Sequence, residues 1–505
     1  MKILSASDVH TVDRATIERQ GIRSIDLMER AAQRLFEQTQ LDFPNEKTTF
    51  VIFCGNGNNG GDGLALGRLL YQAGRSVRIL LQNSEEYSAD NLENQQRLHN
   101  MAVKVEAISN EILFSDVDII VDCLFGIGLS RPLNQDWHVL ISAINATKNT
   151  VIAVDIPSGL YADQTSDFTA PIIQADWTYT FHCPKLALLQ PENGKYVGSF
   201  QVLDIGLSES ALQEIESRHQ FITKKSVQQL VSMPSRFAHK GTFGHALISG
   251  GSYGKIGAVH LSAKAALKSG CGMITIHSPA CAYPILQTNF PEAMLTTDET
   301  FEHLSAFPTA INPYKAIGFG MGMSQHEKTK SALFEFLRNL SHSSTHANLV
   351  LDADALNILS QHPEYLFLLP KEAILTPHPK ELERIIGSWQ NDWEKLAKAR
   401  AFAQKHQVIV LIKGANTAVV LPDGEIHFNS TGNWGMATAG SGDVLAGIIT
   451  SLLAQSFLPK NAAILGVYLH GLAADCASRH IHPKSIIASD IISGISDAWE
   501  DILPV

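Results

Sequence analysis

The sequence contains no hydrophobic run long enough to cross a membrane. Across its 505 residues, no apolar stretch approaches the roughly 18 residues that a spanning helix requires. The stretch Met1 to Arg14 alternates polar and apolar side chains and lacks the apolar core of a signal peptide. We therefore expect a cytoplasmic protein that does not contact a membrane.

Cysteine is scarce, and the cysteines that exist are not clustered. The sequence has six cysteines, none in a Cys-x-x-Cys spacing, and most lie in apolar runs. This pattern argues against a zinc site and against a disulfide framework. We interpret them as small core residues: Cys54, Cys123, Cys183, Cys271, Cys281 and Cys476.

Clustered positive charge is also lacking. The chain carries 39 basic and 50 acidic residues, a formal net charge of −11, and its obvious basic pair, Lys224-Lys225, is short. Because neutralising a phosphate backbone requires grouped Lys and Arg, a general nucleic-acid binder is disfavoured. The balance indicates a solvated acidic surface.

The length predicts two or three domains, and one polar segment separates two halves. Leu207–Val231 is richer in Ser, Glu, Gln and Lys than its surroundings, and Met233-Pro234 follows it before a new glycine-rich series. We place one domain at residues 1–215 and the second at residues 225–505.

Both halves alternate apolar strand-like runs with helical patterns, which predicts two α/β domains. Continuous rather than alternating hydrophobicity favours strands buried on both faces, hence mostly parallel sheets. The strands expected in the first half are Phe50–Cys54, Val77–Leu81, Ile119–Cys123 and Val151–Ile156, with helices over Ser7–Gln38 and Leu64–Ala73. Those expected in the second half are Ala246–Ser249, Ile274–His277, Ala316–Phe319, Leu349–Asp352, Ala373–Thr376 and Val408–Ile412, then a hairpin about Asp423-Gly424.

A glycine-rich loop follows the first predicted strand. Gly55-Asn56-Gly57-Asn58-Asn59-Gly60-Gly61-Asp62-Gly63 contains the Gly-x-Gly-x-x-Gly spacing of dinucleotide-binding loops. The acid that should end the next strand and hold a ribose hydroxyl is missing, because that strand ends at Leu81-Gln82-Asn83. An ordinary Rossmann dehydrogenase is therefore disfavoured.

Two further strands in the first half end at carboxylates, Asp122 and Asp155. Ligands of open α/β sheets bind beyond the carboxyl ends of the strands, so these loops and the glycine loop are expected to converge on one pocket. The alternative, that Asp122 and Asp155 only cap turns, stays open on sequence grounds.

In the second half, Gly440-Ser441-Gly442-Asp443 precedes an apolar helix expected from Val444 to Leu453. Free amides at a helix N-terminus attract a phosphate, and a carboxylate beside it can act as a base. A plain helix cap explains the same residues equally well. Lys413 is similarly either a phosphate contact or a solvated strand end, and His378 either orients a ligand or bonds to backbone.

Several motifs together resemble known families. Asn58–Gly63, Asp122 with Phe125–Pro132, and Asp155-Ile156-Pro157-Ser158-Gly159 are similar to the NAD(P)H-hydrate epimerase family, as is the opening Asp13-Arg14. The second half resembles the ADP-dependent NAD(P)H-hydrate dehydratases, which have a ribokinase-like fold. Its matching segments are Gly250-Gly251-Ser252, Gly320-x-Gly322, Leu351–Asn357, Thr376-Pro377-His378-Pro379, Lys413-Gly414-x-x-Thr417 and Gly432–Gly447.

The resemblance covers nearly the whole chain, in the order of a bifunctional nicotinamide-nucleotide repair enzyme. It implies a Rossmann-like N-terminal domain that interconverts the R and S hydrates NADHX and NADPHX. It also implies a C-terminal domain that dehydrates the S form while ADP becomes AMP and phosphate. Potassium and magnesium are the implied ions, and a homo-oligomer is expected.

The resemblance also implies a role for individual residues. Asp155 and Asp443 are the expected acid/base residues. Hydrate contacts in the first domain are expected from Asn58, Asn59, Gly60, Gly61, Asp62, Gly126, Ile127, Gly128, Leu129, Ser130, Arg131, Pro132 and Asp155. Potassium ligands are expected from Asn59, Asp122 and Ser158. Hydrate contacts in the second domain are expected from Ala258, Gly322, His378 and Asp443. Contacts to ADP or AMP are expected from Lys413, Gly414, Ala415, Asn416, Thr417 and Gly442.

Two other functions remain open on sequence grounds. A ribokinase-like kinase for a vitamin precursor would use Asp443 in the same way. A nucleotide-binding module with an inactive first domain is the third possibility, although the retained Asp122, Asp155 and Asn58–Gly63 argue against it. Lys380, Trp434 and Ala439 depart from the family pattern, which puts loop geometry in question more than reaction class.

Overall fold

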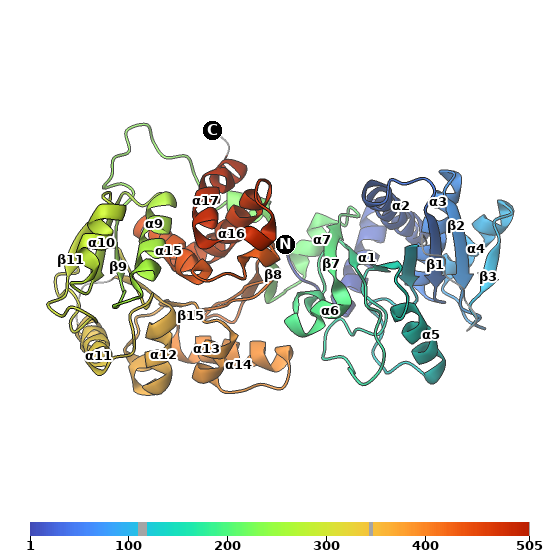
Figure 1. Cartoon of the computed structure of the whole chain (residues 1–505). Helices are drawn as coiled ribbons and strands as arrows, with labels where there is room; N and C mark the ends of the chain where they lie inside the picture. Colours follow the sequence, from blue (N-terminus) through green and yellow to red (C-terminus); the bar gives the residue numbers. More distant parts are fainter. Residues whose placement is uncertain (110–118, 343–346, 504–505) are drawn as a thin grey trace. The chain divides into compact units, whose positions relative to one another are not determined.

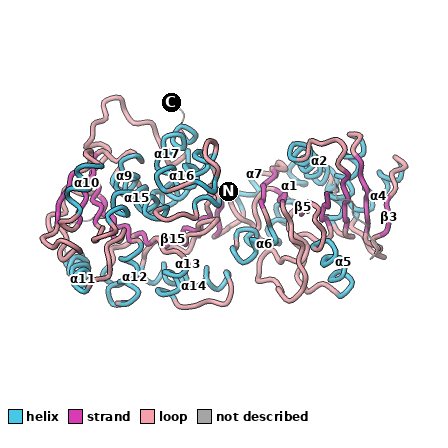
Figure 2. Tube along the Cα trace, viewed as in Figure 1, coloured by secondary structure: helices cyan, strands magenta, loops and turns pink. Residues whose placement is uncertain are grey.

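The computed structural model describes residues 1–109, 119–342 and 347–503. Within these residues the chain forms two compact units (Figures 1 and 2). One contains Lys2–His219 with Asn391–Trp393, and the other contains Met1, Gln220–Gln390 and Glu394–Val505. Among the described residues, no helix combines the length and apolar character that crossing a bilayer requires.

The N-terminal unit is built on a parallel seven-stranded sheet in the order β3-β2-β1-β4-β5-β6-β7. Its strands are β1 (Thr49–Cys54), β2 (Ser76–Leu81), β3 (Val105–Ala107), β4 (Ile119–Cys123), β5 (Thr150–Val154), β6 (Trp177–Phe181) and β7 (Ser199–Leu203). The strand order reverses between β1 and β4, which is where ligands enter open α/β sheets.

Helices cover both faces of this sheet. They are α1 (Ala6–Gln20), α2 (Ser24–Asp42), α3 (Asn58–Gln72), α4 (Ala89–Asn100), α5 (Gln135–Asn145), α6 (Gly194–Val197) and α7 (Glu209–Glu214). Phe50 and Ile52 of β1 pack with α2, α3 and α4, whereas Val51 and Phe53 pack with α5. Each strand residue therefore faces one of two helical layers, and this explains the continuous apolar runs.

Helix α3 begins at Asn58 rather than at the predicted Leu64, so the part of the glycine loop from Asn58 to Gly63 is helical. Its glycines allow close packing. A Cβ on Gly63 would lie 2.7 Å from the Cβ of Cys123, and one on Gly60 would overlap the carbonyl oxygen of Gly55. From sequence alone these glycines were predicted to form a loop. The sequence does not show that the first turns of α3 pack against the sheet, where a side chain would not fit.

The C-terminal unit is built on a sheet in the order β11-β10-β9-β12-β13-β14-β15-β16-β17-β8. The strands are β8 (His219–Phe221), β9 (His245–Ser249), β10 (Met273–Ser278), β11 (Met294–Thr297), β12 (Ala316–Phe319), β13 (Asn348–Leu351), β14 (Ile374–Leu375), β15 (Ile409–Ile412), β16 (Ala418–Val420) and β17 (Ile426–Phe428). Strands β9 to β15 pair in parallel, and β16 and β17 form the predicted antiparallel hairpin. The predicted α/β class is thus confirmed in both units.

Two helical layers also enclose the second sheet. The helices are α8 (Lys224–Gln228), α9 (Ile256–Lys268), α10 (Ala282–Asn289), α11 (Glu327–Ser341), α12 (Ala353–Gln361), α13 (Pro379–Ile386), α14 (Asp392–His406), α15 (Ser441–Ala454), α16 (Pro459–Ser478) and α17 (Ala488–Ile502). Helices α9, α10, α15, α16 and α17 share one core with the strands, and α11 to α13 lie on the opposite face (Figure 1).

The polar segment expected at the boundary is not a plain linker, because it contains α7, β8 and α8. All six cysteines are free and buried, as the apolar surroundings predicted.

Helix α15 lies at the centre of the second unit. Every residue from Val444 to Ala454 is buried, and the helix contacts α9, α16, α17 and strands β9, β12 and β13. Gly447 lies directly against α9, where a Cβ would overlap the carbonyl oxygen of Ser262. A side chain at residue 447 would therefore push two core helices apart.

We expect Gly447→Ala to destabilise the C-terminal unit by about 1–3 kcal/mol through overpacking, despite the better helix propensity of alanine. Gly257→Ala in α9 is the matched control, because no atom lies within 4 Å of its added Cβ. Chemical denaturation of both variants measures the difference. Equal stability of the two would contradict the packing argument.

Candidate functional site

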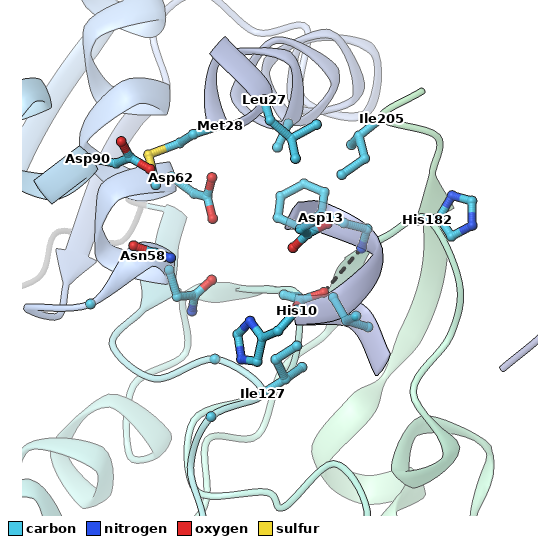
Figure 3. A pocket seen from close by; sticks show the side chains of 18 of the residues that line it. His10, Asp13, Leu27, Met28, Asn58, Asp62, Asp90, Ile127, His182 and Ile205 are labelled. Atoms are coloured by element: carbon cyan, nitrogen blue, oxygen red, sulfur yellow. Dashed lines mark hydrogen bonds between the residues drawn. The ribbon is translucent and has the colours of Figure 1, made fainter. Parts of the chain in front are cut away.

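A cavity of about 790 Å³ lies in the N-terminal unit, at the carboxyl ends of its central strands (Figure 3). Its walls come from α1, α2, the start of α3 and the loops after β4, β5 and β6. The predicted site residues that line it are Asn58, Asn59, Asp62, Gly126, Ile127, Gly128, Leu129, Ser130, Arg131 and Asp155. The expected convergence of the strand-end loops is therefore observed.

Five predicted residues of this unit do not line the cavity. Gly60 and Gly61 are buried in α3, where a Cβ on Gly61 would lie 2.9 Å from the sulfur of Met28. Pro132 lies just beyond the lining segment that ends at Arg131, and Asp122 and Ser158 lie fully buried behind the wall. These positions shape the cavity from outside its lining.

Asp155 is held by a buried ion pair with Lys185. Its Oδ1 accepts hydrogen bonds from Thr180 Oγ1 and the Phe181 amide, each at 3.2 Å, as well as from Lys185 Nζ. The ammonium also donates to Thr180 Oγ1 at 3.0 Å and to the Phe181 carbonyl at 3.2 Å, and Lys185 is only 1% exposed. Asp155 adopts φ +68°, a strained conformation for a residue other than glycine.

Sequence reasoning missed Lys185. The available signal was a lysine shortly after a run of aromatic and threonine residues, which is typical of a strand but was not predicted as one. This run is β6, which pairs with β5 in the sheet. Once β6 is placed, Lys185 falls beside the end of β5 and therefore beside Asp155.

Two more carboxyls enter the same cavity, Asp13 from α1 and Asp62 from α3 (Figure 3). Burial, reinforced by the negative charge of Asp155 and opposed by Lys185, raises the pKa of Asp13 to about 6. Burial also raises the pKa of Asp62 well above its usual value, with Asp155 and Asp13 adding to the effect. Of these two, only Asp62 was among the predicted site residues.

A group of oxygen atoms lies behind the cavity. Asp122 Oδ1 accepts from Ser158 Oγ at 2.6 Å and from the Leu124 amide at 3.1 Å, and Oδ2 accepts from the Ser158 amide at 2.8 Å. Asn59 donates to the Phe125 carbonyl at 3.1 Å, while its own Oδ1 is buried without a hydrogen-bond partner. Burial raises the pKa of Asp122 to about 6 even though these hydrogen bonds lower it. A buried carboxylate beside an unsatisfied amide oxygen suits a hard cation.

The second group of predicted residues lies at the carboxyl edge of the C-terminal sheet. Asp352 follows β13, His378 follows β14 and Lys413 follows β15, and these strands are neighbours in parallel pairing. Lys413 Nζ lies 2.6 Å from Asp352 Oδ1, in an ion pair that is mostly buried. Asp352 was not predicted as a site residue, although an acid at the end of an apolar strand was a usable signal.

Asp443 lies in the first turn of α15, which begins at Ser441 rather than at the predicted Val444. Gly440 caps the helix at φ +87°, and a Cβ on Gly442 would lie 3.0 Å from Lys413 Nζ. Burial and the negative charge of Asp352 raise the pKa of Asp443 to about 7, while Lys413 opposes them. A carboxyl that ionises near neutral pH thus lies beside free helix amides and a lysine.

His378 is the N-cap of α13. Its Nδ1 accepts hydrogen bonds from the amides of Lys380 and Glu381, and its Nε2 lies 3.3 Å from Glu381 Oε1. Burial and nearby Lys413 lower the pKa of the imidazole. The backbone-bonded alternative left open by the sequence is therefore realised, and Nε2 is the ring atom on the side away from the capped amides.

The remaining predicted residues lie in two places. Ala258 and Gly322 are in close contact, because a Cβ on Gly322 would lie 3.1 Å from the Cβ of Ala258. Gly414, Ala415, Asn416 and Thr417 form the turn after β15, closed by a hydrogen bond from Thr417 Oγ1 to the Gly414 carbonyl at 3.1 Å. This turn directly follows Lys413.

Comparison with known proteins gives one consistent result. The family model described as NAD(P)H-hydrate dehydratase matches residues 246–496, and the one described as YjeF-related protein N-terminus matches residues 24–187. The bifunctional NAD(P)H-hydrate repair enzyme Nnr of Moorella thermoacetica is 34% identical over 97% of this chain and 95% of that protein. The Escherichia coli K12 protein of the same name is 31% identical over 97% of this chain and 92% of that protein.

A solved structure is also similar to part of the chain. It is the ADP/ATP-dependent NAD(P)H-hydrate dehydratase of Bacillus subtilis, co-crystallised with ATP and Mg²⁺. The two are 28% identical, with a TM-score of 0.48, over 56% of this chain and 98% of that chain.

Proposed function

This chain belongs to the family of bifunctional NAD(P)H-hydrate repair enzymes, and from that membership we propose how its two units divide the two reactions. Residues 1–215 carry the epimerase, and residues 225–505 carry the ADP-dependent dehydratase. The observation that supports this division is that each unit holds its own carboxyl beside a lysine, the buried Asp155 with Lys185 and the half-buried Asp443 with Lys413. A cytoplasmic homo-oligomer is the form in which we expect the enzyme to work.

The epimerase substrate has a distinctive reacting carbon. Hydrating the enamine of a dihydronicotinamide places the new hydroxyl on the carbon next to the ring nitrogen, which makes a carbinolamine. Losing that hydroxyl as water leaves a planar iminium, and water that returns to the other face gives the other epimer. Asp155 is the proposed acid/base residue for this exchange, and Lys185 and the Phe181 amide hold its Oδ1 in place.

The hydrate is proposed to bind along Asn58, Asp62 and the loop Gly126–Arg131, which together line the cavity. Gly60, Gly61 and Pro132 contribute through the shape of the wall rather than by lining it.

Potassium is proposed behind this cavity, with Asn59, Asp122 and Ser158 as its ligands. The unsatisfied Asn59 Oδ1 and the buried Asp122 carboxylate support this proposal. When bound, the ion supplies positive charge that favours ionised Asp122. The ligand set contains only oxygen, which fits an alkali cation and not zinc.

The dehydratase must turn a poor leaving group into a good one. Transfer of a phosphoryl group from ADP to the hydroxyl of the S hydrate gives a phosphate ester and AMP. Loss of phosphate from this carbon, together with a proton from the adjacent ring carbon, then restores the double bond of NAD(P)H. Asp443 is proposed to take the hydroxyl proton, while the amides at the start of α15 stabilise the phosphoryl oxygens. Magnesium is proposed to accompany ADP and to neutralise phosphate charge.

The other predicted residues hold the two ligands in this scheme. Lys413, the turn Gly414–Thr417 and Gly442 are proposed to contact the nucleotide, and Ala258, Gly322 and His378 to contact the hydrate. The positions of all of these at the carboxyl edge of one parallel sheet support the proposal.

A two-stage assay tests this division of work. A mixture of R and S NADHX is first incubated with the protein and potassium but without nucleotide, and the epimers are separated on a chiral column. ADP and magnesium are then added and NADH absorbance is followed. We expect equilibration of the epimers in the first stage and full conversion in the second; replacing potassium with choline should slow the first stage. No recovery of NADH would overturn the proposal.

A further inference from the structure

Asp13 is a carboxyl in the epimerase cavity to which no role has yet been assigned. It is on α1, ahead of residues 24–187, where the N-terminal family model matches. Its side chain lines the cavity (Figure 3), as do Asp155 and Lys185. In the described part of the chain it accepts no hydrogen bond and forms no ion pair, whereas Asp155 is fully engaged at Oδ1.

The fold holds Asp13 firmly in this position. On either side of it in α1, Val12 and Thr16 are buried. Val12 packs against Leu27 of α2, and Thr16 Oγ1 accepts a hydrogen bond from the Ser208 amide at 3.0 Å. A largely buried acidic side chain with no hydrogen-bond partner among the described residues is thus maintained in the cavity, which costs stability unless a ligand uses it.

The surroundings of Asp13 favour its protonated form. Burial and the Asp155 charge raise the pKa of Asp13 to about 6, and Lys185 lowers it. Asp155 Oδ1 accepts a hydrogen bond from Lys185, whereas none of the described residues acts as such a partner for Asp13. Asp13 is therefore the carboxyl to which we assign the acid role. The other charged or titratable side chains that line the cavity are Asp62, Asp90, His10, Arg14, Arg131, His182 and Cys183.

Epimerisation at a carbinolamine carbon needs two such groups. One acid must protonate the hydroxyl as the carbon–oxygen bond breaks, and one base must take a proton from the water that adds to the opposite face. Two carboxyls that reach the ring from different directions supply both groups without one side chain moving between faces. Asp13 on α1 and Asp155 after β5 reach the cavity from two different elements.

We infer that Asp13 is a second catalytic residue of the epimerase and works as the partner of Asp155. This inference rests on the proposed function of the N-terminal unit. In one direction, Asp13 gives its proton to the hydroxyl, the carbon–oxygen bond breaks, and the electron pair of the ring nitrogen forms the iminium. Water adds to the other face and Asp155 takes the released proton. In the reverse direction the two carboxyls exchange roles, and proton transfer through water resets the pair.

The Asp13→Asn variant tests this role, with Glu18→Gln as the matched control because Glu18 is exposed on the same helix. Epimerisation of purified R-NADHX is measured without nucleotide, so that the dehydratase is silent. In Asp13→Asn we expect kcat to fall by about 10²-fold or more with little change in KM. We also expect the loss of a limb near pH 6 in the kcat/KM profile, where activity of the wild type falls as Asp13 ionises. Glu18→Gln should behave as wild type.

Further measurements distinguish a misfolded variant from an incorrect reaction mechanism. Chemical denaturation reports whether the N-terminal unit of the variant is folded. Conversion of S-NADHX with ADP, which we assign to the C-terminal unit, should equal that of wild type. Epimerisation by wild type in 18O-labelled water should place 18O on the reacting carbon of the product.

An epimer that keeps its original oxygen overturns the inference, as does an Asp13→Asn variant with wild-type kcat and an unchanged pH profile. A wild-type protein that does not epimerise R-NADHX at all contradicts the proposed function itself.

Discussion

The Asp443→Asn variant is expected to lose dehydratase activity by about 10²–10⁴-fold, the range that a positioned acid or base contributes. Asparagine keeps the size of the side chain and its place in the first turn of α15, so the helix start and Gly440 cap should remain. The variant lacks the carboxylate that we propose as acceptor of the hydroxyl proton. The epimerase, which we propose for the other unit, should be unaffected.

The pH dependence of the dehydratase gives the same test a second readout. Burial and Asp352 raise the pKa of Asp443 to about 7. A reaction that needs the ionised carboxylate therefore gains rate as pH rises to about 7 and levels off above it. We expect this limb in wild type and its absence from the residual activity of Asp443→Asn. Asp497→Asn, the same change at an exposed position of α17, is the control. Wild-type dehydratase activity in Asp443→Asn would show that Asp443 is not the base.

The second large effect is expected at Asp155. Asp155→Asn is the variant that changes the backbone least. Asparagine tolerates the left-handed φ of +68°, whereas alanine would adopt it with strain. We expect a loss of epimerase activity of about 10²–10⁴-fold, measured by chiral separation, with S-NADHX dehydration intact.

Stability must be separated from chemistry in this variant. Removing the carboxylate leaves Lys185 as an uncompensated buried charge, at a cost of about 3–5 kcal/mol. The double variant with Lys185→Met removes both charges and should recover much of that loss without recovering epimerisation. Recovery of activity along with stability would show that Asp155 supports the fold and not the reaction.

Much of this architecture was predictable because it depends on local patterns. Strands β4 and β12 have the bounds that were expected from sequence, Ile119–Cys123 and Ala316–Phe319, and the hairpin of β16 and β17 turns at Asp423-Gly424. The starts of α3 and α15 were missed, since glycines that pack a helix against a sheet look like loop residues in sequence. Hydrophobic periodicity does not show which atoms these glycines contact in the fold.

The chemistry of the sites was predictable only in part. Asp155 and Asp443 stand at the end of a strand and the start of a helix, where sequence reasoning looks for function. Lys185 and Asp13 are different, because each becomes meaningful only through a residue far away in the chain. Their pairing with Asp155 depends on how β5, β6 and α1 assemble, which no local spacing reports.

The burial of α15 has a consequence for how the second unit moves. Local opening is cheapest where few apolar contacts are lost, and a helix enclosed on every side is among the last segments to open. The buried body of α15, from Val444 to Ala454, is therefore expected to exchange among the slowest segments of its unit, and Asp443 lies on the turn just before it. We expect the proposed base to be held in place by this rigid helix, and any opening for substrate to occur in the turns at the edge of the sheet.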